Sequence, residues 1–260
     1  MTLALVTMIH LASIPGEDGY EREWSMRIRG WLDSLLVHQT QFPDEVFLID
    51  TTLTSTLDVL EATFPHLDNS RFHYIHRPSL SFNICRACNI GIRLADSAFI
   101  AKTDIDLIYA PDFVESLKSY IGRRLNIGVY TRIRYLPQSY GNGYDGNWNR
   151  VERIVKEKRA YVCRGALQCF HRDRWYGVHG YDERFDGGLG YQDNDLHQRI
   201  TRAGARIRFL KPARICHRWH QRSFMKRGDY STRKFLRDDP PLVANPDGWG
   251  EMYIEEEEEE

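Results

Sequence analysis

Asp104 and Asp106 are the two side chains whose type and spacing most directly suggest catalytic chemistry in this sequence. They flank Ile105 and follow the strand-like run 98–103. Side chains of an extended segment alternate with a period of two, so both carboxylates point the same way at the end of a strand. Paired carboxylates suit a hard divalent cation that keeps open positions for water or a phosphate group. Turn capping or plain surface charge is the alternative interpretation, so the surrounding elements must decide.

Strand and helix signals alternate along the chain before Asp104. Apolar runs predict strands at 3–9, 45–49, 71–75 and 99–103, and helical periodicity predicts helices at 21–37, 54–64 and 82–95. This alternation predicts an α/β fold with a mostly parallel central sheet flanked by helices. Ligands of such sheets bind at the carboxyl ends of the strands, where Asp50 and Asp104 fall.

The pattern changes after Asp106. It predicts helices at 111–120 and 192–203 and strands at 127–131, 162–170 and 206–209. Segment 137–149 is predicted to be a loop. Its aromatic residues Tyr140, Tyr144 and Trp148 either stack on sugar rings or pack onto the body of the domain. We find no internal repeat and no linker that would divide the chain.

Composition excludes several classes of protein. The chain has 260 residues, of which 42% are hydrophobic, so it can bury a large core and is not disordered. The formal charge is −1, and the six glutamates at 255–260 are predicted to form a disordered acidic tail. The remaining positive excess suits a protein that handles anionic nucleotides but gives no argument for binding DNA or RNA.

The cysteines and the amino-terminal segment predict a cytoplasmic protein. Five cysteines without disulfide spacing suggest a reducing compartment, and the chain has neither a run of about 18 apolar residues nor a secretory leader. Cys85 and Cys88 lie in a predicted helix, where we interpret them as core residues rather than as half of a zinc or redox site. Peripheral membrane contact would need a partner or the basic stretch 218–237.

Several spaced motifs resemble the nucleotide-sugar glycosyltransferases of the GT-A fold. They are SFNICRACNIG at 81–91 with TDIDLI at 103–108, GYDERF at 180–185 with GGLGYQDNDL at 187–196 and Arg199, and the runs 31–36, 39–40 and 46–50. The motifs are similar to those of family 2 enzymes and of the β-1,4-galactosyltransferase and chondroitin-synthase-like group. The resemblance covers about residues 3–220. It implies a single GT-A domain whose donor-binding part ends near residue 110, followed by an extension at 221–254 that packs on or near it.

The resemblance implies a metal-dependent, inverting glycosyltransferase that moves a sugar from a nucleotide-sugar donor, preferably a UDP-sugar, to a glycan or other hydroxyl acceptor. Asp106 is then the direct ligand of Mn²⁺ or Mg²⁺, and Asp104 contacts the ribose or the water on the metal. The family's third protein ligand is a histidine after the last strand. His217 and His220 both match that place, and we favour His217.

Asp193 matches the family's general base, which takes the proton of the acceptor hydroxyl. Asp195 is sufficiently explained as negative charge at a helix amino terminus. Gln192 stands where the family usually has glutamate, which leaves the acceptor open. Glycines at 187, 188 and 190 suit a lid, although Leu189 replaces the tryptophan of the galactosyltransferase-like group. The predicted acceptor or lid contacts are Gly188, Leu189, Tyr191, Gln192 and Trp148.

Asp50 matches the acid that recognises uridine in the family, and capping of the turn that follows is its alternative role. Asn89 is expected to fix packing beside the site rather than to touch substrate. The other predicted nucleotide-sugar contacts are Ile9, His10, Arg27, Arg86, Thr103 and Asp104.

Two other functions remain open from the sequence. A phosphatase of the haloacid dehalogenase type also uses Asp-x-Asp, but it needs the motif after the first strand and Thr or Val where this chain has Ile108. A catalytically silent sugar-binding or nucleotide-binding module on the same fold is the second alternative. The presence of Asp193 and His217 argues against silence.

Overall fold

The computed structural model describes residues 1–10, 28–65, 67, 70–122, 124–140, 144–188, 190–219 and 231–251. Eight strands form one sheet in the order β3-β2-β1-β4-β7-β6-β8-β5. The strands are β1 Leu3–Ile9, β2 Glu45–Asp50, β3 Phe72–His76, β4 Phe99–Thr103, β5 Leu107–Tyr109, β6 Ile127–Tyr135, β7 Tyr161–His171 and β8 Arg206–His217.

The first four strands of that order, β3-β2-β1-β4, are parallel throughout. Strands β1 and β4 are buried along their whole length, as expected for continuous apolar runs covered on both faces. Their carboxyl ends share one edge of the sheet, which places His10, Asp50 and Asp104 along that edge. The α/β fold and its four leading parallel strands are therefore confirmed.

The other half of the sheet is mixed. Strand β7 pairs antiparallel with β4 and β6, β6 pairs parallel with β8, and β8 pairs antiparallel with β5. Four of the seven strand pairs in the sheet are thus parallel. Strand β8 extends to His217, well beyond the predicted end at residue 209, because its last residues pair with the three-residue strand β5.

The ladder between β6 and β7 contains a large bulge. Its register passes from Tyr130 opposite Gln168 to Thr131 opposite Cys163, so residues 164–167 of β7 have no counterpart in β6. Leu167, inside the bulge, pairs with Thr103 at the end of β4. The bulge therefore lies beside the first of the two candidate carboxylates.

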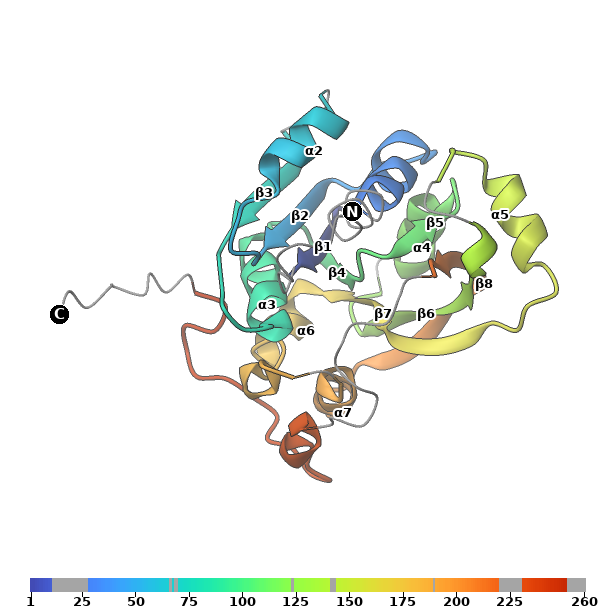
Figure 1. Ribbon diagram of the computed structural model, residues 1–260. Helices are drawn as coiled ribbons and strands as arrows, with labels where there is room; N and C mark the ends of the chain where they lie inside the picture. The colour runs from blue at the N-terminus through green and yellow to red at the C-terminus, as the bar shows by residue number, and fades with distance from the viewer. Residues whose placement is uncertain are drawn as a thin grey trace.

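Helices cover both faces of the sheet (Figure 1). Residues 28–32, the π-helix η1 (Asp33–Val37), α2 (Leu57–Thr63) and α4 (Phe113–Ile121) contribute to the hydrophobic cluster on one face. The cluster on the other face includes residues from α3 (Ile84–Leu94), α6 (Arg172–Gly177) and α7 (Gln192–Arg202). Cys85 and Cys88 are buried in this second cluster, which confirms that they are core residues.

The segment predicted as a loop at 137–149 is partly helical. The short 3-10 helix η2 (Gln138–Tyr140) starts it, and α5 (Trp148–Val155) begins at its end, where the Asn147 side chain accepts a hydrogen bond from Arg150 N. Tyr140 and Tyr144 are buried in a third hydrophobic cluster with residues of α5. Of the two roles left open for these tyrosines, packing onto the domain is the one the structure shows.

Residues 231–251 pack against the face that carries α3, α6 and α7. After the 3-10 helix η4 (Ser231–Phe235), Trp249 is buried with its ring stacked on His179, at 6.0 Å between ring centroids. Asn245 accepts a hydrogen bond from Glu183 N at 3.0 Å and donates to His179 O at 2.7 Å. This end of the described chain therefore holds the turn at 179–183. Within the described ranges, none of the helices has the length and apolar character needed to cross a membrane.

Candidate active site

Asp106 and His217 meet at the carboxyl edge of the sheet. Strand β5 pairs with the last residues of β8 so that Leu107 lies opposite His217. This register brings Nε2 of His217 to 3.2 Å from Oδ2 of Asp106. Both side chains are largely buried, with 18% and 16% of their surface exposed. A carboxylate oxygen and an imidazole nitrogen thus converge on one point.

The pKa of His217 reflects this neighbour. Burial alone would lower the pKa of the imidazole, but attraction to Asp106, together with its hydrogen bond, outweighs burial and raises it to about 9. The Nδ1 atom of the ring lies 2.6 Å from the carbonyl oxygen of Arg218. His220, the alternative third ligand, lies outside the described residues.

Asp104 is held by a buried lysine. Lys102, on β4, is 2% exposed and donates from Nζ to Oδ1 of Asp104 at 2.6 Å and to the carbonyl oxygen of Gly165 at 2.9 Å. Burial alone would lower the pKa of this lysine, but Asp104 and Asp193 outweigh that effect and raise it. The side chain therefore stays a charged ammonium between β4 and the bulge of β7.

Asp193 lies on the other side of that bulge, in the first turn of α7. A Cβ atom placed on Gly165 would come 2.6 Å from Oδ2 of Asp193, so the carboxylate rests directly on the glycine backbone. Its Oδ1 atom is buried without a hydrogen-bond partner among the described residues. Burial and the charge of Asp104 raise the pKa of Asp193, while Lys102 and Arg164 act against them.

The residues around Asp193 set the start of α7. Tyr191 precedes the helix with φ of 68°, a left-handed conformation that is uncommon for a residue with a side chain. Gln192 is buried, and its Oε1 has no hydrogen-bond partner among the described residues. Asp195 forms a fully buried ion pair with Arg199 at 2.7 Å, and Arg199 also donates to the carbonyl oxygen of Gly180. Asp195 thus has a structural role.

The loop before α7 is anchored on the amino terminus of α3. Asp186 accepts hydrogen bonds from the backbone N–H groups of Cys85 and Arg86 at 2.7 and 3.2 Å. Asn89 donates to Tyr181 O and accepts from Tyr181 N, so it fixes packing beside the site as expected. Gly188, one of the predicted lid residues, is buried, and Leu189 lies outside the described residues.

Asp50 is fully buried, and its carboxylate bonds to its own loop. It accepts hydrogen bonds from the backbone and hydroxyl groups of Thr52 and Thr56 at 2.6 to 2.9 Å, and from the hydroxyl of Tyr74. Burial raises the pKa of Asp50, but these hydrogen bonds outweigh it and lower the pKa. The structure therefore assigns Asp50 to the turn after β2, and the uridine contact implied by the resemblance stays a prediction.

The other predicted nucleotide contacts differ in exposure. Ile9 and Thr103 are buried, and the Thr103 hydroxyl bonds to that of Tyr109, so their side chains face the core. His10 is partly buried, with Nδ1 3.0 Å from Oγ1 of Thr51. Arg86 lies at an exposed position with Nε 3.4 Å from Oε2 of Glu183. Arg27 lies outside the described residues.

Trp148 lies in a different hydrophobic cluster from the residues of α7. It begins α5 and packs with the cluster of Ile108, Val151 and Cys216, while Asp193 belongs to α7 on the face of α3 and α6. Figure 1 shows α5 beyond β8, at the opposite end of the sheet from α2. Trp148 therefore packs with Ile108 and Cys216, which neighbour Asp106 and His217 in the chain, and its contact with an acceptor stays a prediction.

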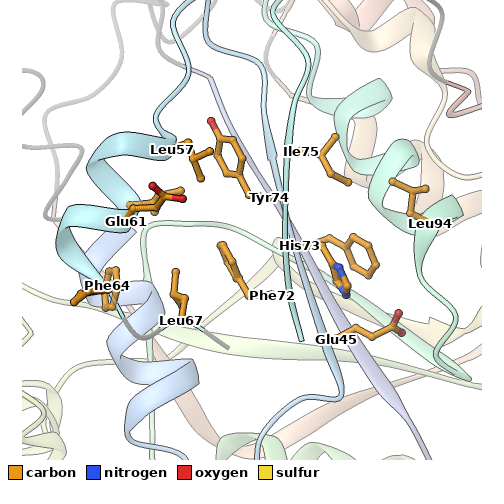
Figure 2. Close-up of a pocket in the computed structure, with 13 residues that line it drawn as sticks. Glu45, Leu57, Glu61, Phe64, Leu67, Phe72, His73, Tyr74, Ile75 and Leu94 are labelled. Atoms are coloured by element: carbon orange, nitrogen blue, oxygen red, sulfur yellow. The ribbon is translucent and has the colours of Figure 1, made fainter. Parts of the chain in front are cut away.

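A hollow of about 900 Å³ follows the edge strand β3. Figure 2 shows apolar side chains on both sides of that strand, with Phe72 and Tyr74 facing α2 and His73 and Ile75 facing away from it. None of the predicted catalytic or metal-binding residues lines this hollow. The carboxylate site and the hollow are therefore separate features of the molecule.

Two residues of the site escaped the sequence analysis. Lys102 reads as one polar interruption of an apolar strand, and nothing in its spacing shows that its amine is buried against Asp104. Gly165 reads as an ordinary strand glycine. An isolated glycine inside a strand is a recognised sign of a bulge or of close approach by another group. The sequence contains this sign, but nothing in it indicates which residue approaches Gly165.

Three solved structures are similar to this fold. A fragment of S. aureus TarS in complex with UDP is 13% identical with a TM-score of 0.59 over 84% of this chain and 61% of that one. GalNAc-T7 with UDP, GalNAc and Mn²⁺ is 18% identical, with a TM-score of 0.61 over 84% of this chain and 44% of that one. The mannosyltransferase PcManGT from Pyrobaculum calidifontis with GDP-Man and Mn²⁺ is 16% identical, with a TM-score of 0.55 over 89% of this chain and 59% of that one.

These likenesses establish the GT-A fold, while the chain spans less than two thirds of the length of each of the three proteins. The family model for glycosyl transferase family 2 matches residues 23–176, more than half of the chain. The chain belongs to glycosyl transferase family 2. A second model, the N-terminal domain of galactosyltransferase, matches residues 152–221, and a comparison with curated proteins found no match.

Proposed function

We propose that this protein transfers a sugar from a nucleotide-sugar donor, with UDP-sugars as first candidates, to an acceptor hydroxyl with inversion at the anomeric carbon. The observation that carries the proposal is the pairing of Asp106 with His217 at the carboxyl edge of the sheet, with Asp104 two residues before Asp106 in the chain and Asp193 across the β7 bulge. Family membership supports the reaction class.

The side chains of Asp106 and His217 fit a divalent cation that binds together with the nucleotide-sugar. Oδ2 of Asp106 and Nε2 of His217 lie 3.2 Å apart and, once the proton of His217 is displaced by a metal, would offer the oxygen and nitrogen ligands that Mn²⁺ accepts. Among the described residues, no group of three or more His, Cys, Asp or Glu side chains could hold a metal ion. Diphosphate oxygens and water would complete the coordination, as is common for Mg²⁺-type sites. When bound, the cation neutralises charge on the departing nucleoside diphosphate.

Asp193 is the proposed general base. As the acceptor oxygen bonds to the anomeric carbon, the bond from that carbon to the diphosphate oxygen breaks, and the acceptor proton passes to the Asp193 carboxylate. The raised pKa of Asp193, caused by burial and by Asp104, makes this carboxylate a stronger base than an exposed one. Its Oδ1 is buried and has no hydrogen-bond partner among the described residues, so this oxygen has unused capacity to accept a proton.

A donor screen tests the proposal. UDP-, GDP- and dTDP-linked sugars are incubated with the protein with and without Mn²⁺, and donor hydrolysis and donor binding are measured. We expect Mn²⁺-dependent hydrolysis of one donor class, and loss of that dependence in Asp106→Asn. Absence of both metal-dependent hydrolysis and binding with every donor would contradict the proposed function. Binding without hydrolysis would instead favour the silent module.

A further inference from the structure

Lys102 carries a buried charge that the proposed reaction does not yet use. Its side chain is 3% exposed, and its ammonium makes two short hydrogen bonds, to Asp104 Oδ1 and to the carbonyl oxygen of Gly165. Taking an ammonium out of water costs several kcal/mol, which only good geometry and full pairing offset. Strand β4 is buried along its whole length, so an apolar side chain at position 102 would avoid this cost.

The two acceptors of Lys102 belong to the two halves of the proposed site. Asp104 follows β4, on the donor side, whereas Gly165 lies in the β7 bulge that has no counterpart in β6. Asp193 rests on that same glycine, with Oδ2 at 2.6 Å from where a Cβ atom would lie. Lys102 therefore touches one candidate carboxylate directly and supports the other through a single backbone unit.

We propose that Lys102 is a positioning residue that fixes Asp104 and Asp193 relative to each other across the bulge. The proposal rests on the proposed glycosyl transfer for its catalytic meaning. With Oδ1 of Asp104 engaged by the ammonium, the other oxygen of this partly exposed carboxylate is left to contact the donor. Because Lys102 holds the carbonyl group of Gly165, the backbone of the bulge keeps a fixed position against the Asp193 carboxylate. Arg164, the other cation near Asp193, lies at an exposed position and donates to Asn194 instead.

Two substitutions and one matched control separate positioning from general stability. Lys102→Met keeps the length of the side chain without its charge, and Lys102→Arg keeps the charge with different geometry. Lys118→Met is the control. Lys118, on α4, also bonds to one carboxylate and one carbonyl group: its Nζ lies 2.8 Å from Oδ2 of Asp44 and 3.1 Å from the carbonyl oxygen of Phe42. Each variant is crystallised without ligand, and its Mn²⁺ affinity, donor KM and kcat are measured on the folded protein.

We expect Lys102→Met to shift the Asp104 carboxylate and the Gly165 carbonyl in the crystal and to lower kcat at least about tenfold, the scale of one lost charge-assisted hydrogen bond. Lys102→Arg should recover part of that loss, and Lys118→Met should keep wild-type kcat. If Asp104, Gly165 and Asp193 keep their positions in Lys102→Met, or if its kcat equals that of wild type, the proposal is wrong. If wild type turns over no donor, the proposed function fails, and the crystal structures alone decide the role of Lys102.

Discussion

The carboxylate of Asp193 lies against the backbone of Gly165, at a distance that leaves no room for a side chain at position 165. Gly165→Ala would place a methyl group 2.6 Å from Oδ2 of Asp193, so one of the two must move. Misplacing a catalytic group by about 1 Å can reduce turnover roughly a hundredfold. We therefore expect Gly165→Ala to lower kcat on that scale while the protein stays folded, as measured by steady-state kinetics and thermal melting.

Gly177→Ala is the control for this prediction. Apart from its chain neighbours and its own helix, no described residue has an atom within 4 Å of the position a Cβ atom would take on Gly177, at the end of α6. This variant should keep both kcat and melting temperature. Equal kcat in the two variants would show that contact with Gly165 does not place Asp193.

Asp193→Asn tests the proposed base directly. The amide keeps the shape of the side chain but cannot take a proton, so turnover should fall by roughly 10²- to 10⁴-fold. Donor binding, measured by titration calorimetry with UDP and Mn²⁺, should stay close to that of wild type. Unchanged turnover would remove Asp193 from the mechanism.

The neighbouring acid Asp195 supplies the contrast. Asp195→Ala leaves the guanidinium of Arg199 buried without its ion-pair partner, and loss of one partner of a buried pair costs about 3–5 kcal/mol. We expect a large drop in the free energy of unfolding, measured by urea denaturation. Loss of turnover with unchanged stability would instead place Asp195 in the site.

Asp50 should behave as a loop anchor. Asp50→Ala leaves the buried N–H groups of Thr52 and Thr56 without their acceptor, which we expect to cost about 3 kcal/mol of unfolding free energy. Tyr74→Phe removes one donor to the same carboxylate and should cost about 1 kcal/mol. Urea denaturation measures both. If Asp50→Asn stays as stable as wild type but loses affinity for UDP, the uridine contact is the correct role.

How much of the fold could be predicted depends on whether each element has a local pattern in the sequence. The strands at 3–9, 45–49, 71–75 and 99–103 were predicted to within one or two residues, because buried parallel strands are continuous apolar runs. Strand β5 was missed, since three residues carry no period, and its pairing with β8 appears only in three dimensions. Helix α5 was missed because its first two residues fall in the segment assigned to a loop and no element was predicted for the rest.

The residues of the site divide in the same way, into those with a local sequence pattern and those whose contacts arise only in three dimensions. The spacing of Asp104 and Asp106 is visible in the sequence, and the family resemblance suggested His217 and Asp193. The contacts of Lys102 with Asp104 and Gly165 were not predictable, because they depend on a bulge whose register no local pattern encodes. Capping of the following turn was one of the two roles considered for Asp50. The sequence does not show which groups bond to its carboxylate, and only the structure identifies them as Thr52 and Thr56.

Asp186 should make stability depend on pH. Burial raises the pKa of this carboxyl from 3.8 to about 6, although the N–H groups of Cys85 and Arg86 act against burial. Between about pH 4 and 6 the folded protein therefore binds a proton that the unfolded chain has released, so its stability falls as pH rises, by up to about 3 kcal/mol. Asp186→Asn should lack this component. Urea denaturation at pH 4, 5 and 6 measures the difference between the two proteins, and parallel curves would contradict the prediction.

Asn245 and Gly250 both bond to Glu183, and Trp249 stacks on His179, so the turn beside Asn89 is completed by the last part of the described chain. This has a consequence for biosynthesis. At about 5–20 residues per second, the ribosome needs roughly 2 to 7 seconds to pass from His217, the last of the proposed site residues, to Gly250. During that interval the nascent chain has made every proposed catalytic residue but not the segment that secures the turn. The site is therefore finished only after all of its proposed catalytic residues have been synthesised.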